Sequence, residues 1–107
     1  MLEEYPLSSV IVHFQGNEEW LTFEKADLKV NTEWNVSSWF VDLVHIQNED
    51  LLAQIRRHSS NEVEIQMETR NGHTLRGSGY FYPSTQHNHG SIRGEDQLAG
   101  LNQILPS

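Results

Sequence analysis

The clearest pattern in the chain is the strict alternation of apolar and polar residues in Glu-Val-Glu-Ile-Gln-Met-Glu, residues 62–68. A period of two is typical of a strand that buries one face and leaves the other in water. The pair Asn71-Gly72 then favours a tight hairpin turn, and residues 74–82 return as a second strand. The segment 61–83 therefore predicts a β-hairpin around which the rest of the domain is organised.

The register of this hairpin follows from its two faces. A two-residue loop would place Met67 opposite Arg76 and mix apolar with polar side chains, so it is disfavoured. A three-residue loop at 70–72, with Gly72 in the left-handed conformation, keeps the faces separate. The predicted inward pairs are Met67–Leu75, Ile65–Gly77 and Val63–Gly79, with Phe81 on the same side.

Gly77 and Gly79 leave the inner face of the second strand without side chains. Glycine inside a strand is typical of sharp curvature, or of close approach by another element or a ligand. Because protein interiors are close-packed, something has to fill the resulting groove. The nearest unassigned apolar residues are Leu51, Leu52 and Ile55, so we expect either these residues or a ligand to occupy the groove.

The other strands are less regular. Residues 10–14 alternate as a first strand, and residues 20–23 form a short return strand after a loop around 16–19. Residues 25–30 alternate as in a strand, but residues 23–28 also fit one helical turn. Residues 39–46 are apolar on both faces, which predicts a central strand buried on two sides.

One helix is predicted over residues 48–58. Asn48 is a suitable N-cap, acidic residues follow in the first turn, and basic residues close the last turn, as the helix dipole favours. Residues 92–98 repeat the glycine and arginine placement of residues 75–81, which suggests two neighbouring strands in one curved sheet. The apolar residues within 101–105 either end that strand or form a terminal turn that packs on the domain or pairs with another copy.

Antiparallel hairpins with a single helix predict an α+β domain: a mostly antiparallel curved sheet or partial β-barrel with one short helix at about residues 48–58. The 107 residues suffice for one domain, 1–107, with its own core. The absence of cysteine excludes a disulfide framework and thiol chemistry. The first residues lack signal-peptide features and no apolar run could span a bilayer, so we expect a cytoplasmic protein.

The formal charge of −8 is distributed unevenly along the chain. Residues 1–50 carry ten acidic residues and two lysines, whereas residues 51–107 carry five acidic residues and five arginines. Phosphate groups would be repelled by the acidic half, so nucleic acids and anionic membranes are not expected as partners. The same charge favours a basic protein partner, although acidity can also serve solubility alone.

No catalytic or cofactor motif stands out. The chain contains no Gly-x-Ser-x-Gly elbow, no His-Glu-x-x-His helix and no phosphate-cradling loop. His87 and His89 stand two apart in a polar loop, with Glu95 or Asp96 as the candidate third ligand. Structural metal sites use four ligands and catalytic sites three, so we predict neither a metal site nor a cofactor.

The candidate binding residues are Arg76, Tyr80 and Tyr82, which the register places on the outer face of the hairpin. Tyrosine and arginine together on an exposed face are typical of protein-interface hot spots and of sugar-stacking platforms. The sequence therefore favours a non-enzymatic domain that binds a protein partner or its own copies, as an inhibitor, an immunity-type protein or a structural component of a phage or cellular assembly. The alternative is a small-molecule or carbohydrate-binding domain, or an enzyme, with its site over Gly77 and Gly79.

Overall fold

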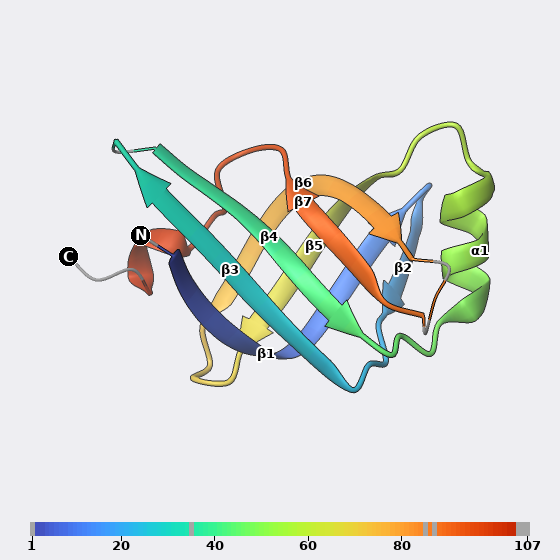
Figure 1. Ribbon diagram of the computed structural model, residues 1–107, viewed down its shortest axis with the longest axis horizontal. Coiled ribbons are helices and arrows are strands. Elements are labelled where there is room, and N and C mark those ends of the chain that lie inside the picture. Colours follow the sequence, from blue (N-terminus) through green and yellow to red (C-terminus); the bar gives the residue numbers. More distant parts are fainter. Residues whose placement is uncertain (1, 35, 85, 87, 105–107) are drawn as a thin grey trace.

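The computed structural model describes residues 2–34, 36–84, 86 and 88–104 of the chain. These residues form an antiparallel β-barrel with one short helix across one end (Figure 1). The elements in chain order are β1 (Leu2–Phe14), β2 (Asn17–Trp20), β3 (Lys25–Glu33), β4 (Val36–Val44), α1 (Glu49–Arg57), β5 (Glu62–Thr69), β6 (Thr74–Pro83), β7 (Gly90–Gly94) and the 3-10 helix η1 (Leu101–Gln103). The predicted fold class, a mostly antiparallel barrel-like sheet with one short helix, is confirmed.

Six strands close the barrel in the order β1-β3-β4-β7-β6-β5, and β5 pairs back onto β1. Closure depends on β1, which changes neighbours along its length: residues 2–6 pair with β3, and the part from Leu7 onward pairs with β5. The change coincides with a register irregularity between Leu7 and Ser9, and such bulges increase the local twist of a strand. The seventh strand, β2, lies outside the closed ring and pairs with β1.

The hairpin of β5 and β6 has the predicted register. Ile65 pairs with Gly77 and Met67 pairs with Leu75. The loop is residues 70–72, and Gly72 adopts a φ of 90°, the left-handed conformation that a three-residue loop requires. The inward apolar residues of β5 are buried, while its acidic residues are exposed. The alternation in the sequence therefore predicted both faces correctly.

The first hairpin forms, but its loop lies elsewhere than predicted. Phe14 pairs with Asn17, so the turn is the two-residue Gln15-Gly16 rather than a loop at 16–19. Both turn residues have positive φ, 52° and 81°, as in the type I′ turn that matches the twist of a hairpin. The prediction was wrong because glutamine is not among the residues that ordinarily indicate a left-handed turn position.

The ambiguous residues 25–30 belong to a strand, because β3 pairs with β4 along its whole length. β4 is central, between β3 and β7, but it spans Val36–Val44 rather than 39–46. Its inward side chains, such as Trp39, are buried, whereas Phe40 and others on the outer face stay partly exposed. The expectation of burial on two sides is therefore wrong, because a barrel has a single apolar interior.

α1 lies within the predicted range, with acidic residues in its first turn and arginines in its last. Its buried side chains are Leu51, Leu52 and Ile55, which join the core of the barrel at the end that the helix covers (Figure 1). With nine residues α1 is too short to cross a membrane, and no other helix in the described ranges is long and apolar enough.

Asn48 does not cap α1 with its side chain, contrary to the sequence prediction. Its amide group instead holds the segment that follows β2. Asn48 Oδ1 accepts a hydrogen bond from the Thr22 N–H at 2.7 Å, and Asn48 Nδ2 donates to the Trp20 carbonyl at 3.0 Å. The Asn48 side chain thus accepts from one backbone N–H and donates to one backbone carbonyl, which are the two bonds that a paired strand would make with this segment.

This contact gives a prediction about stability. We expect Asn48→Asp to lower the free energy of unfolding by about 1 kcal/mol and Asn48→Ala by roughly 2 kcal/mol, because aspartate keeps the acceptor but loses the donor. Chemical denaturation measures both values. Since aspartate is as good an N-cap as asparagine, an Asn48→Asp variant as stable as the parent would support the cap and contradict the bridge.

The groove over the two glycines of β6 is filled by other groups than the α1 side chains or the ligand that the sequence predicted. A Cβ added at Gly77 would lie 2.8 Å from the Trp39 ring and 2.9 Å from Leu98 Cδ1. A Cβ at Gly79 would overlap the backbone carbonyl oxygen of Arg93 in β7. The glycines therefore face inward as expected, and an indole from β4 and the backbone of β7 occupy the space over them.

β7 pairs with β6, as the similarity of residues 92–98 to residues 75–81 suggested. The strand ends at Gly94, however, and does not continue to residue 98. The next residues, 95–97, are exposed, and the chain returns to β6 through a bridge between Ala99 and Arg76. The chain then forms the terminal turn η1, with Leu101 buried. The predicted apolar residue 105 lies outside the described residues.

Candidate functional site

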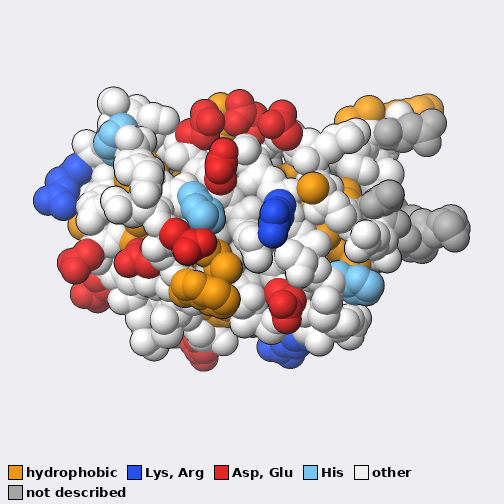
Figure 2. All heavy atoms as spheres, turned by 180° about the vertical axis from the view of Figure 1, so that it is seen from behind, with side chains coloured by type: hydrophobic (Ala, Val, Ile, Leu, Met, Phe, Trp, Pro, Cys, Tyr) orange, Lys and Arg blue, Asp and Glu red, His pale blue; other side chains and the backbone are white. Residues whose placement is uncertain are grey.

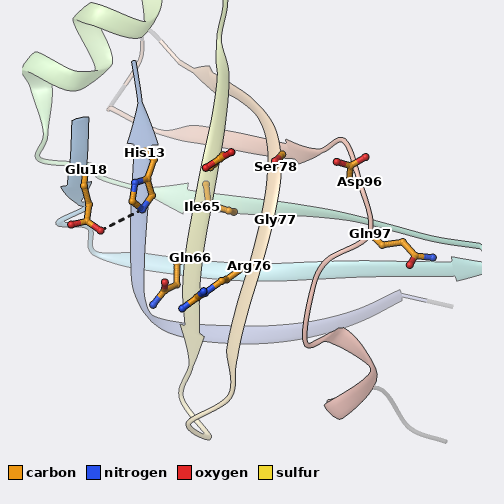
Figure 3. A pocket seen from close by; sticks show the side chains of 10 residues that line it. His13, Glu18, Ile65, Gln66, Arg76, Gly77, Ser78, Asp96 and Gln97 are labelled. Atoms are coloured by element: carbon orange, nitrogen blue, oxygen red, sulfur yellow. Dashed lines mark ion pairs between the residues drawn. The ribbon is translucent and has the colours of Figure 1, made fainter. Parts of the chain in front are cut away.

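Two rows of side chains cross the outer face of the barrel, each with one residue from β2, β1, β5 and β6. Strand register places Glu18, His13, Glu64 and Ser78 in one row and Trp20, Ile11, Gln66 and Arg76 in the next. A hollow of about 540 Å³ lies over these rows, and Asp96 and Gln97 border it beyond β6. Figure 3 shows His13 and Glu18 facing each other on one side of the hollow, with Asp96 and Gln97 on the other.

Carboxylates from three separate elements line this hollow: Glu18 from β2, Glu64 from β5 and Asp96 from the segment after β7. Glu18 Oε1 lies 3.3 Å from His13 Nε2, and both side chains are about half exposed. Among the described residues, neither Glu64 nor Asp96 forms an ion pair, and neither does Arg76, the one arginine of the lining. Figure 2 shows acidic side chains gathered on this face around histidine and basic groups. The hollow is therefore negatively charged.

The acidic residues of the N-terminal half do not form one face of their own. Several of them pair with lysines of β3: Lys29 Nζ lies 2.9 Å from Asp42 of β4 and 3.6 Å from Glu4 of β1, and Lys25 Nζ lies 3.6 Å from Asp27. The hydrogen bond with Asp42, and the charge of that carboxylate, raise the pKa of Lys29. A separate group of carboxylates lines the hollow that spans β2, β1, β5 and β6, and it draws on both halves of the chain.

The three sequence-predicted residues, Arg76, Tyr80 and Tyr82, all lie on the outer face of β6, but only Arg76 lines the hollow. Tyr80 Oη donates a hydrogen bond to Glu95 Oε1 at 3.2 Å, and this bond together with the Glu95 charge raises the pKa of Tyr80. The guanidinium of Arg93 lies 5.8 Å from the centroid of the Tyr82 ring, a cation–π distance. The two tyrosines are thus engaged by neighbours at β7, and the structure does not bring them into the hollow.

The histidines were the other candidates for chemistry. His87 lies outside the described residues, so the expectation that His87 and His89 hold no metal stays a prediction. The His89 ring lies 5.2 Å from the ring of His45, edge to face. Within the described part of the chain, no group of three or more metal-ligating side chains is close enough together to hold an ion.

The hollow is not arranged for acyl transfer. His13 and Ser78 share a row, but Glu64 lies between them, so their backbones are about 10 Å apart at the usual spacing of strands. A general base has to lie within about 3 Å of the group whose proton it removes. Carboxylates, amides and one guanidinium provide acceptors and donors for a polar ligand instead.

The acidic lining could not be predicted from the sequence, for an identifiable reason. Glu64 was correctly placed on the outer face of its strand, but its neighbour His13 comes from the far side of the β1–β5 closure. No local pattern specifies that pairing. The one available signal was that Glu18, His13 and Glu64 all occupy outward positions of their strands.

An aromatic side chain stands at the margin of the same face. Trp20, at the end of the second row, is 61% exposed, and the side chain of Ile11 opposite it is buried. An exposed tryptophan beside carboxylates and amides is a composition found at protein and sugar binding surfaces. Comparisons with models of protein families, with curated proteins and with solved structures find no match for this chain.

Proposed function

We propose that this domain is a non-enzymatic binding domain whose acidic hollow receives a basic segment of a protein partner. The observation that carries the proposal is the convergence of Glu18, Glu64 and Asp96 from three elements on one hollow. Like charges gathered on one surface repel one another, so a lysine or arginine from a partner both removes repulsion and adds attraction. A domain that acts as an inhibitor, or as one component of an assembly, requires no chemistry beyond such binding.

The remaining lining groups suit a polypeptide ligand. The side-chain amides of Gln66 and Gln97 can each donate to a peptide carbonyl and accept from a peptide N–H. The guanidinium of Arg76 offers several donors to backbone carbonyls or to a carboxylate that accompanies the basic residues. Trp20 presents an aromatic face beside the hollow on which an arginine can stack.

The test uses a fluorescently labelled hexa-arginine peptide as the probe, with binding followed by anisotropy at low salt. We expect the triple variant Glu18→Gln, Glu64→Gln, Asp96→Asn to bind about tenfold more weakly, because each exposed charge pair contributes on the order of 0.5 kcal/mol. Raising the salt concentration should slow association of the peptide with the parent protein, since exposed charges are screened beyond about 8 Å at physiological ionic strength.

A second triple variant controls for net charge. Glu33→Gln, Glu49→Gln and Asp50→Asn remove the same number of charges from the end of β3 and the start of α1, outside the hollow. This variant should retain most of the affinity of the parent protein. Equal weakening in the two triple variants would mean that the peptide responds only to overall charge, and the proposed site would be wrong.

The rival function is binding of a small molecule or carbohydrate. One observation supports it: Trp20 is exposed at the end of the second row of side chains. Because Trp39 and β7 fill the space inside Gly77 and Gly79, such a ligand would have to use the outer side of the barrel. Saccharide titrations followed by tryptophan fluorescence separate the two functions. Quenching that is lost in Trp20→Ala but unaffected by salt would favour the rival over a basic partner.

A further inference from the structure

A second surface lies at the tip of the β3–β4 hairpin and borders the acidic hollow only at Gln97. Trp34 stands at this tip and is 94% exposed, so its side chain contributes almost nothing to the core. Two more exposed apolar residues lie near this tip: Val36 pairs with Glu33, and Leu2 pairs with Asn31. Figure 2 shows hydrophobic side chains at the corresponding end of the molecule, opposite the end that carries α1 in Figure 1.

The backbone at Trp34 is also unfavourable for a bulky residue. Its φ is 54°, in the left-handed region that large side chains rarely adopt and that glycine or asparagine occupies at lower cost. Folding alone thus gives no reason for a tryptophan here, because the residue is neither buried nor suited to its conformation. Such a residue at an exposed tip points to a contact made outside the chain.

An apolar hollow lies beside this tip, where Ser37 of β4 pairs with Thr32 of β3. It has a volume of about 520 Å³ and is lined by Ser37 and Trp39 of β4 and by residues 97–101, which include Leu98 and Leu101. Ser37 pairs with Thr32, two residues before Trp34, so Trp34 stands roughly 7 Å along the hairpin from this hollow at the rise of a strand. The molecule therefore carries both a projecting aromatic group and an apolar hollow on one end.

We propose that two copies of the chain associate through this end, with Trp34 of each copy inserted into the 97–101 hollow of the other. A two-fold interface requires that the projecting group and its receptor lie on the same surface of one molecule, and here they do. Reciprocal insertion closes after two copies, so the contact produces a dimer rather than a chain of molecules. It also covers Leu2 and Val36, the other described exposed apolar side chains of this end.

The dimer is weak for two physical reasons. Among the described residues, three exposed apolar side chains lie at this end, whereas a stable interface buries about 800 Å² on each partner. Each copy also carries a charge of −8, so the two copies repel one another. We expect a dissociation constant on the order of 100 μM at low salt, which tightens several-fold as salt screens the repulsion. The basic peptide should respond to salt in the opposite sense, so failure of one proposal is distinguishable from failure of the other.

The experiment is sedimentation equilibrium of the full chain from 10 μM to 1 mM. It is run at about 0.05 and 0.5 M salt, so that repulsion between the two copies is screened weakly in one case and strongly in the other. The parent protein should shift from monomer to dimer with concentration. Trp34→Ala removes the projecting group, and Ala99→Glu places a charge in the hollow at an exposed position. Both variants should stay monomeric throughout, with melting temperatures close to that of the parent.

Mixing the two variants tests the reciprocal arrangement directly. Trp34→Ala keeps an intact hollow and Ala99→Glu keeps an intact indole, so their mixture can form one of the two insertions. The mixture should therefore associate more strongly than either variant alone, and more weakly than the parent. A parent protein that stays monomeric at 1 mM would overturn the proposal, as would a mixture that associates no better than its components. Val44→Ala, a change on the outer face of β4 away from this end, should leave the dimer intact.

Discussion

Trp39→Ala is expected to lower the free energy of unfolding by about 4 kcal/mol, the largest loss predicted for a single residue of this domain. The indole is 3% exposed and lies over Gly77 and Gly94, so its removal leaves a cavity that two glycines cannot fill. Its Nε1 also donates to the Asp96 carbonyl at 2.7 Å, and this carbonyl loses its partner. Denaturant unfolding measures the change.

The contact between Trp39 and Gly94 can be isolated by a double-mutant cycle. A Cβ at Gly94 would overlap the indole ring, so Gly94→Ala alone should destabilise the domain by roughly 2 kcal/mol. In the Trp39→Leu background the same change should cost much less, because leucine leaves room for a methyl group. Additive losses would mean that the two positions are not packed against each other as described.

Gly79→Ala is expected to destabilise the domain by about 3 kcal/mol, which corresponds to a fall of roughly 12 to 24 °C in melting temperature. A methyl group at this position would overlap the Arg93 carbonyl oxygen, a backbone atom that can move only if β7 shifts away from β6. Whether the change lowers or raises stability tests the predicted overlap. Where space permits, glycine-to-alanine changes stabilise a protein by about 0.4–1 kcal/mol through the unfolded chain.

Ser78→Ala is the matched control for this prediction. Ser78 is the adjacent residue of β6 and faces the outer hollow, so the change should alter stability by less than about 0.5 kcal/mol. A Gly79→Ala variant that is as stable as Ser78→Ala, or more stable than the parent, would contradict the close approach of β6 and β7.

Those parts of the fold that depend on local pattern could be predicted from the sequence. The alternation of β5 and the position of Gly72 determined the register of the central hairpin, because any other register mixes the two faces. The helix followed from its charge distribution and apolar stripe. The Gln15-Gly16 turn was missed because glutamine does not ordinarily indicate a left-handed turn position, and the bridging role of Asn48 was missed because its partners lie 26 and 28 residues away in the sequence.

The candidate site could be predicted only in part. Arg76 was identified as an outward residue of β6, and the hollow does include it. The acidic residues that give the hollow its charge were not recognised, because Glu18 and Glu64 become near neighbours only when β1 pairs with β5. Likewise, Trp39 could not be assigned to the glycine groove before the barrel order was known. These contacts are determined by the pairing of strands that are far apart in the sequence, and the composition of the chain does not specify that pairing.

The change of neighbours along β1 has a consequence for folding kinetics. Hairpins such as β3–β4 and β5–β6 close short loops, but the contact between Ser8 and Glu68 joins residues 60 positions apart. Closing so long a loop costs chain entropy before any contact compensates, so we expect the β1–β5 pairing to form late, on the millisecond-to-second scale of β-barrels. Because that pairing also brings Glu18 and His13 beside Glu64, the acidic hollow is completed in the same step. Binding competence and barrel closure should therefore appear with one rate constant.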